Sequence, residues 1–164
     1  MFGISFLAPA LPANKSMRFL DLSHNKLSDV DVTCLASALA ENSALEELKL
    51  VNCNLSDKAA HILARHMKRM KGLKSLWLQN NPFGVKGAFS LFKAARENRQ
   101  LHQLWLPTDK GFAVDKMQED LHVHFQLNQA GHGLLYHDLN NVPEALWPHV
   151  LARVNSIETW RSVS

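Results

Sequence analysis

The hydrophobic positions of the chain recur every 28 residues. Three copies of one pattern align in full: Met17, Leu20, Leu22, Asn25 and Leu27; Leu45, Leu48, Leu50, Cys53 and Leu55; and Leu73, Leu76, Leu78, Asn81 and Phe83. A fourth copy begins with Leu101, Leu104 and Leu106 and then loses the pattern. A pattern that returns at a fixed period of this length is typical of stacked structural repeats. We therefore expect an array of similar units.

Each repeat is expected to contain a short strand followed by a helix. In the first half, Leu20 and Leu22 alternate with Phe19, Asp21 and Ser23, which is the period of a strand. In the second half, apolar residues are spaced by three and four positions, which predicts a helix with one buried stripe. The predicted helices cover about residues 29–42, 57–71 and 85–98, with Leu35, Leu63 and Leu91 at equivalent buried positions.

These segments resemble the leucine-rich repeat of the ribonuclease-inhibitor type. The strand halves that carry the resemblance are MRFLDLSHNKL, LEELKLVNCNL and LKSLWLQNNPF, and the helix halves are VDVTCLASALAENS and KGAFSLFKAARENR. The resemblance covers about residues 3–110 and implies an α/β solenoid, with parallel strands on a concave face and helices on the convex face. Members of the family mostly bind proteins, as enzyme inhibitors, ligand sensors, actin-cap proteins or GTPase-activating proteins. The fold alone does not choose among these functions.

The repeat frame divides the chain into three parts. The repeats occupy residues 17–110, as 17–44, 45–72, 73–100 and a partial copy at 101–110. Residues 1–16 match helix-half positions, so we interpret them as a partial repeat without its strand, or as a cap. The strand that begins at Met17 would then have an open edge, which predicts self-association, residues 1–16 folded over that edge, or repeats missing from the N-terminal side.

Residues 111–164 are interpreted as a helical C-terminal cap, because a solenoid must cover its last apolar face. A helix is expected from about Asp115 to Gln129, ended by Gly131 and Gly133, and Leu134 with Tyr136 would form a last short strand. A second helical segment is expected after Pro143, with its buried stripe at Leu146, Trp147, Val150, Leu151 and Val154. This tail resembles tails that follow such repeats in uncharacterised proteins of single-celled algae.

The composition is that of a single globular domain, and it excludes a disulfide-rich scaffold and a membrane-spanning protein. The chain has 164 residues, of which 46% are hydrophobic and 20% are charged, with a formal net charge of +3. Two cysteines exclude a disulfide scaffold, and no apolar run is long enough for a membrane span. Because there is also no convincing signal peptide, we expect a cytoplasmic or nuclear protein that does not bind a membrane.

Candidate binding residues lie on the predicted concave face. Neighbouring parallel strands stack equivalent residues into rows. One row reads Asp21, Lys49, Trp77 and Trp105, and Glu47, Gln79 and Gln103 occupy adjacent rows. Exposed tryptophans are frequent at binding hot spots, and Lys49 beside Trp77 favours a cation–π contact. The alternative is that the two rings only stack on each other, or that the tail covers Trp105.

The repeat turns carry a second set of polar residues. Asn25 and Asn81 are expected to hydrogen-bond buried backbone groups, and Cys53 replaces asparagine at the equivalent position of the second copy. The consensus of the repeat that these segments resemble allows cysteine in place of asparagine. We therefore interpret the three residues as structural. Cys34 and Cys53 are expected to be buried, reduced thiols.

Neither a metal nor a cofactor is predicted. His122, His124, His132 and His137 invite a zinc hypothesis, but two histidines at this spacing on a helix point in different directions and no cysteine lies nearby. We interpret them as solvated histidines. The chain contains no glycine-rich phosphate loop and no motif of a metalloprotease or serine hydrolase, so it is predicted not to be an enzyme.

A basic run contains Arg65, Lys68, Arg69 and Lys71. Nucleic-acid binding would need a broader patch with interleaved aromatic residues, so a solvated helix face is the preferred interpretation. The sequence therefore predicts a non-enzymatic module that binds a protein on its concave face. The alternatives are a regulator of an enzyme or GTPase, as inhibitor or activating protein, and the sensor region of a larger receptor-like protein. The predicted strand-to-helix loops offer no arginine, which argues against GTPase activation.

Overall fold

The computed structural model describes residues 3–134 of the chain. The strands are β1 (Phe19–Asp21), β2 (Glu47–Lys49), β3 (Ser75–Trp77) and β4 (Gln103–Trp105). The α-helices are α1 (Gly3–Leu7), α2 (Asp29–Glu41), α3 (Asp57–Met67), α4 (Val85–Glu97) and α5 (Phe112–Leu134). Two short 3-10 helices, η1 (Ala8–Ala10) and η2 (Thr108–Lys110), complete the described elements.

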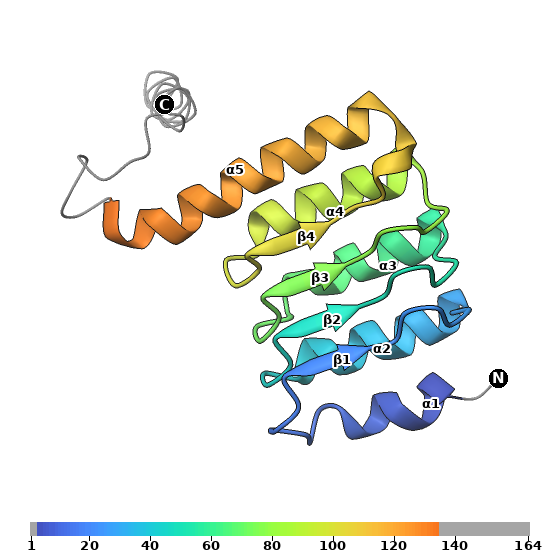
Figure 1. Ribbon diagram of the computed structural model, residues 1–164. Coiled ribbons are helices and arrows are strands. Elements are labelled where there is room, and N and C mark those ends of the chain that lie inside the picture. Colours follow the sequence, from blue (N-terminus) through green and yellow to red (C-terminus); the bar gives the residue numbers. More distant parts are fainter. Residues whose placement is uncertain (1–2, 135–164) are drawn as a thin grey trace, which may run out of the picture.

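The strands form one parallel sheet in the order β1-β2-β3-β4. Equivalent residues of successive repeats stand opposite one another, so that Leu20, Leu48, Leu76 and Leu104 form a row across the sheet. Figure 1 shows α2, α3 and α4 lying side by side in a second layer behind the strands. The α/β repeat solenoid expected from the 28-residue period is thereby confirmed.

The hydrophobic core lies between the strand layer and the helix layer. The leucines at the centres of β2, β3 and β4 are fully buried, and so are the leucines of the helix stripe; these are Leu48, Leu76, Leu104, Leu35, Leu63 and Leu91. Complete burial of one leucine stabilises a fold by about 1.5–3 kcal/mol. Because every repeat supplies the same positions, the core is continuous from one repeat to the next.

The helices begin at caps that differ between repeats. Ser28 and Asp31 form a capping box at the start of α2, in which each side chain accepts a hydrogen bond from the other residue's backbone N–H. Gly84 has no side chain to cap α4, and Asp57 of the preceding repeat takes that role. Its Oδ1 accepts hydrogen bonds from the N–H groups of Gly84 at 3.0 Å and Gly87 at 2.8 Å. A Cβ at residue 87 would lie 2.6 Å from this oxygen, so any larger residue there would have to displace the Asp57 carboxylate from the helix start.

Two buried asparagines fasten the helix ends to neighbouring segments. Asn98 Nδ2 donates to the Met67 carbonyl at 2.6 Å, and Asn98 Oδ1 accepts from the backbone N–H groups of Gln100 and Leu101. Asn42 makes the equivalent bonds two repeats earlier. Each asparagine side chain therefore has two roles: it caps the C-terminal end of its own helix, and it hydrogen-bonds to the segment that precedes its repeat.

The helix α3 ends earlier than expected. It stops at Met67 rather than near residue 71, whereas α2 and α4 end within one residue of the expected positions. Met70 stands where the other repeats have asparagine, and the chain there forms tight turns, with the Met70 N–H donating to the Met67 carbonyl at 3.1 Å. The basic residues Lys68 and Lys71 consequently lie beyond the helix, not on one helical face with Arg65.

The segment before the first strand occupies a helix-half position. Ile4, Ala8 and Leu11 are buried in the common core. The Nδ2 atom of Asn42 donates to the carbonyls of Leu11 and Asn14, which attaches this segment to the end of α2. Figure 1 shows α1 continuing the helix layer below α2.

The last described helix differs in length from its prediction. It runs over Phe112–Leu134 rather than 115–129, so Gly131 and Gly133 do not end it and Leu134 is helical instead of part of a strand. Val114, Leu121 and Phe125 are buried against the last repeat. Tyr136, the segment after Pro143 and its proposed buried stripe lie outside the described residues.

The α5 helix also takes over hydrogen bonds of the last strand. Gln118 Nε2 donates to the Leu104 carbonyl at 2.8 Å, and Gln118 Oε1 accepts from the Leu106 N–H at 2.8 Å. Between β1 and β2 the group equivalent to the Leu106 N–H is the N–H of Leu22, which donates to the Lys49 carbonyl of the next strand at 3.0 Å. The side-chain amide of Gln118 therefore replaces the peptide of a fifth strand.

Replacing Leu76 by alanine is expected to lower the free energy of unfolding by about 2–5 kcal/mol, because a fully buried side chain in the third of the four strands leaves a cavity. Chemical denaturation monitored by circular dichroism measures the change. Val30→Ala is the control, since that side chain is 71% exposed on α2 and its loss should change stability by less than about 0.5 kcal/mol. Equal stability of the Leu76 variant and the parent would contradict the observed core.

Candidate functional site

The sheet surface that faces away from the helices is called the open face here. Strand alternation turns the central leucine of each strand into the core and its two neighbours to the open face. The open face therefore carries two registered rows. One contains Phe19, Glu47, Ser75 and Gln103, and the other contains Asp21, Lys49, Trp77 and Trp105.

Aromatic rings and one cation meet at the centre of the open face. Trp77 and Trp105 stack with their ring centroids 5.3 Å apart and their planes inclined by 21°. The Lys49 Nζ lies 5.1 Å from the Trp77 ring centroid and 5.2 Å from that of Phe19. Glu47 Oε1 lies 3.6 Å from the same Nζ. We call Phe19, Glu47, Lys49, Trp77 and Trp105 the aromatic cluster.

The aromatic cluster is only partly covered within the described part of the chain. Trp105 is 38% exposed and Phe19 is 48% exposed, whereas Trp77 is half-buried. Trp77 Nε1 and Gln79 Oε1 are shielded from solvent, and neither has a hydrogen-bond partner among residues 3–134. A shielded donor without a partner costs about 1–3 kcal/mol. Near the open face, accessible apolar surface thus lies beside a donor and an acceptor that are shielded from solvent and have no partner in the described part of the chain.

The remaining residues predicted for this face have local partners. Asp21 Oδ1 accepts from the Ser23 backbone N–H at 2.8 Å, and the hydrogen bonds from Ser23 hold the pKa of Asp21 below its usual value. Gln103 Oε1 accepts from the Ser75 hydroxyl at 3.1 Å. Neither is part of the aromatic cluster. Phe19 was not among the predicted binding residues, although its place directly before Leu20 is the signal that puts it on the open face.

The turn residues form a ladder of backbone contacts. Asn81 Oδ1 accepts from the N–H groups of Cys53 at 2.9 Å and Leu55 at 3.1 Å. Asn81 Nδ2 donates to the carbonyls of Leu50 and Leu78 at 2.8 and 2.9 Å. A single amide therefore serves two repeats.

Cys53 and Asn25 make fewer of these contacts. The Cys53 thiol donates to the Leu22 carbonyl at 3.1 Å, which reproduces one of the asparagine bonds. Asn25 is exposed, and its Nδ2 donates only within its own repeat, to the carbonyls of Leu22 and Ser23. The difference follows from position, because among residues 3–134 no earlier strand with its strand-to-helix turn precedes that of Asn25.

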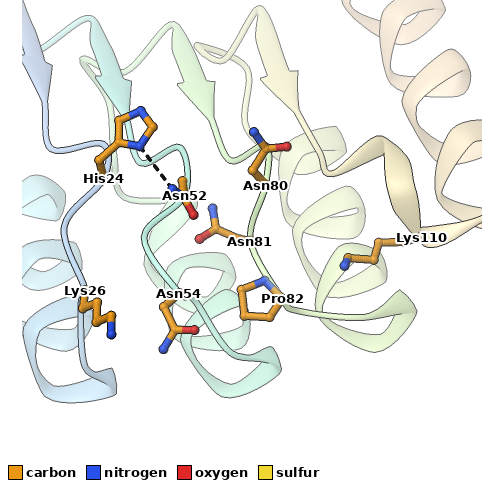
Figure 2. Close-up of a pocket in the computed structure, with 8 residues that line it drawn as sticks. All are labelled: His24, Lys26, Asn52, Asn54, Asn80, Asn81, Pro82 and Lys110. Atoms are coloured by element: carbon orange, nitrogen blue, oxygen red, sulfur yellow. Dashed lines mark hydrogen bonds between the residues drawn. The ribbon is translucent and has the colours of Figure 1, made fainter.

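A polar pocket of about 470 Å³ lies beside the turns, on the edge of the molecule where the strands lead into the helices (Figure 2). Its lining residues are His24, Lys26, Asn52, Asn54, Asn80, Asn81, Pro82 and Lys110. His24 Nδ1 and Asn52 Nδ2 are 3.1 Å apart, and both residues have positive φ angles, as do Asn54 and Asn80. The lining contains amides and lysines but no carboxylate, so its chemistry favours hydrogen-bond acceptors and anionic groups.

Two predictions about histidine and cysteine are wrong. His124 is buried and its ring lies against Phe125, because α5 turns this position toward the last repeat instead of toward solvent. Cys34 is exposed on α2, while Cys53 is buried as expected. In the described part of the chain, no three histidine, cysteine, aspartate or glutamate side chains are placed to hold a metal ion. His132 and His137 are not among the side chains that the structure describes.

The basic segment is partly neutralised by neighbouring carboxylates. Within the segment, Lys68 forms an ion pair with Glu97, and Lys74, which follows the segment, pairs with Glu46 at 2.8 Å. Lys68 and Glu97 belong to adjacent repeats, as do Lys74 and Glu46. These contacts support the interpretation of the segment as a solvated surface.

Comparisons with known proteins agree on the fold. A family model described as Leucine Rich repeat matches residues 13–36. No curated protein matches the chain. The structure is similar to "Leiomodin-1 Actin-Binding Site 2 (ABS2)", with a TM-score of 0.63 and 16% identity over 81% of this chain and 95% of that one.

It is also similar to the tropomodulin C-terminal domain of Caenorhabditis elegans, with a TM-score of 0.55 and 12% identity over 80% of this chain and 98% of that one. Together with the 28-residue strand–helix period, these likenesses define a leucine-rich-repeat fold. No helix in the described part of the chain is long and apolar enough to cross a membrane.

Asn81→Ala is expected to destabilise the protein by about 2–4 kcal/mol more than Asn25→Ala, because it leaves buried backbone groups of two repeats without partners. The two asparagines occupy equivalent positions, so the second variant is a matched control. Urea denaturation of both variants measures the difference. Similar losses at the two positions would show that the contacts between repeats do not carry the effect.

We expect the two thiols to differ in reactivity. Burial raises the pKa of the Cys53 thiol, so this residue stays protonated and inaccessible at neutral pH, whereas Cys34 is exposed. Alkylation with iodoacetamide followed by peptide mass spectrometry should show Cys34 modified at least about tenfold faster in the folded protein. In denaturant the two rates should converge. Comparable rates in the native protein would contradict the buried environment of Cys53.

Proposed function

We propose that this protein is a non-enzymatic module that binds a partner protein on the open face of its sheet. The observation that carries the proposal is the aromatic cluster, in which Trp105 and Phe19 remain accessible on either side of Lys49 and Trp77. Tryptophan, tyrosine and arginine dominate the energetics of protein interfaces, and large rings bury much surface at a small entropy cost.

The charges of the cluster also bear on recognition. Glu47 Oε1 lies 3.6 Å from the Lys49 Nζ, so the centre of the open face carries little net charge. Trp77 Nε1 and Gln79 Oε1 are shielded from solvent and are therefore out of reach of a docking partner unless the side chains move. Apolar contact with the accessible rings is expected to determine recognition.

The structural neighbours support a protein partner without identifying it. One of them is an actin-binding site by its title, and the present chain shares only its fold at 16% identity. The ribonuclease-inhibitor type of repeat, a cytoplasmic or nuclear location and the concave curvature of the open face are parts of this proposal. Regulation of an enzyme would be one consequence of such binding.

Trp105→Ala tests the proposal, with monomeric actin as the first purified probe and a screen of purified candidate proteins beyond it. Loss of a hot-spot ring should weaken binding by about 30-fold or more, which corresponds to about 2 kcal/mol. Trp105 is chosen instead of Trp77, because the half-buried Trp77 also contributes to packing. Isothermal titration calorimetry measures the affinity, and thermal melting verifies that the variant is folded.

Phe89→Ala is the matched control, because Phe89 is an exposed ring on α4, in the helix layer on the other side of the sheet. It should leave affinity unchanged. A partner whose affinity drops with Phe89→Ala and not with Trp105→Ala would move the site to the helix layer. A melting temperature that falls strongly in the Trp105 variant would show that this ring is structural.

A further inference from the structure

The two edges of the sheet differ in whether their backbone N–H and C=O groups have hydrogen-bond partners. At each of the three strand junctions, two consecutive N–H groups of the later repeat donate to one carbonyl of the earlier repeat. The donors are Glu46 and Glu47 to Arg18, Lys74 and Ser75 to Glu46, and His102 and Gln103 to Lys74, at 2.8–3.0 Å. On β4, Gln118 takes the groups that a following strand would use. One edge of the sheet is therefore closed by a side chain.

The other edge, at β1, has no such substitute among residues 3–134. The N–H groups equivalent to the donors of the later repeats belong to Arg18 and Phe19, and no described carbonyl accepts from them. The Lys49 carbonyl accepts from the Leu22 N–H, and its equivalent on β1 is the carbonyl of Asp21. The outer edge of β1 thus presents the same donors and acceptors as the edges of β2, β3 and β4 that are occupied.

The side chain of Asn25 also makes fewer hydrogen bonds than its equivalent in the third repeat. In the third repeat, Asn81 Oδ1 accepts from two N–H groups of the preceding repeat, those of Cys53 and Leu55. Asn25 holds the equivalent position and already uses its Nδ2 within its own turn, as Asn81 does. Its Oδ1 accepts no hydrogen bond from the residues described. An amide oxygen in this position fits the backbone of an additional turn.

The apolar layer is incomplete only on the strand side. Leu20 and Leu22 are half-buried, whereas the equivalent leucines of the second and third repeats are fully buried; these are Leu48, Leu50, Leu76 and Leu78. The helix side of the same unit is present, because α1 and η1 contribute Ile4, Ala8 and Leu11 to the core. Within residues 3–134, the strand side of this unit is therefore less covered than the strand side of the later repeats.

We propose that the outer edge of β1 binds a strand-and-turn segment of a partner protein, running parallel to β1 and carrying leucine or a similar apolar residue at two alternate positions. The three internal junctions of the sheet are the model for this interface. A parallel segment places the N–H groups five and seven residues after its first leucine at Asn25 Oδ1, as Cys53 and Leu55 follow Leu48. An antiparallel segment leaves that oxygen without donors.

A second copy of this chain fits the edge less well. Head-to-tail stacking would bring β4 of one copy to β1 of another, but α5 packs against β4 and its Gln118 already occupies the Leu104 carbonyl and the Leu106 N–H. Pairing of β1 with β1 around a two-fold axis is antiparallel. The edge therefore fits the parallel segment proposed above better than it fits a second copy of this chain, by strand addition.

A synthetic peptide with the sequence of residues 71–83, KGLKSLWLQNNPF, is the probe, because its strand precedes β4 inside the fold and pairs with it in parallel, as the bound segment would precede β1. It is titrated into the isotope-labelled full chain and followed by NMR. We expect chemical-shift changes at residues 18–25 and slower amide exchange at Arg18 and Phe19. A peptide with aspartate at both alternate leucines should bind at least about tenfold more weakly, because the apolar layer then receives two charges.

Orientation and site are tested separately. A spin label at the C-terminus of the peptide should broaden the amide signals near Asn25, whereas a label at its N-terminus should broaden those near Met17. Asn25→Ala should weaken peptide binding several-fold, and Trp105→Ala should leave it unchanged, which separates this edge from the open-face proposal. Melting curves of both variants verify their folding.

The proposal is overturned by any of four results. These are no response of β1 at millimolar peptide, reversed broadening by the two labels, shifts confined to the aromatic cluster, or occupation of the edge by a second copy. Analytical ultracentrifugation across a concentration series detects the last of these.

Discussion

The structure depends on satisfying backbone groups that are buried between stacked repeats. A strand of three residues cannot hold two layers together by itself, and each turn leaves N–H and C=O groups that water does not reach. An unmade bond to such a group costs about 1–3 kcal/mol, which is a large part of the stability of a small domain. Asn81 supplies these bonds at the strand-to-helix turn, and Asn98 supplies them at the helix end. Both side chains join their own repeat to the one before it.

The same constraint explains the C-terminal end of the array. The last strand has groups that would remain unpaired, and a leucine face that would contact water. The α5 helix meets both needs, because Gln118 pairs with the strand while Val114, Leu121 and Phe125 cover the core. A primary amide is suited to this role, since it carries a donor and an acceptor with nearly the geometry of a peptide group. The array is thereby closed at one end with a single side chain at the strand edge.

Periodicity determined how much of this could be predicted. The strands, their register and the core leucines follow from the 28-residue spacing, because equivalent positions in a parallel array must stack. The meeting of Lys49, Trp77 and Trp105 followed from the same register. The contacts that could not be predicted are those made by residues without an equivalent in the 28-residue repeat pattern. Gln118 belongs to a helix without a repeat partner, and Asp57 caps a helix of the next unit only because Gly84 lacks a side chain. The burial of His124 could not be predicted from the sequence, because it depends on how α5 is rotated about its axis against the repeat array.

The aromatic cluster can be understood as a consequence of the solenoid geometry. Core positions in such a fold are fixed by packing, whereas the open-face positions of each strand contribute little to the core and are free to vary. In this chain those positions place Lys49 between two aromatic rings and stack a third ring beside them. Cation–π contacts at exposed sites are worth only about 0.5–1 kcal/mol, and an accessible tryptophan adds little to stability. The exposed rings therefore contribute more free energy when a partner excludes water from them than they do in the free protein. That difference between the free and the covered surface is the physical argument for a binding role of the open face.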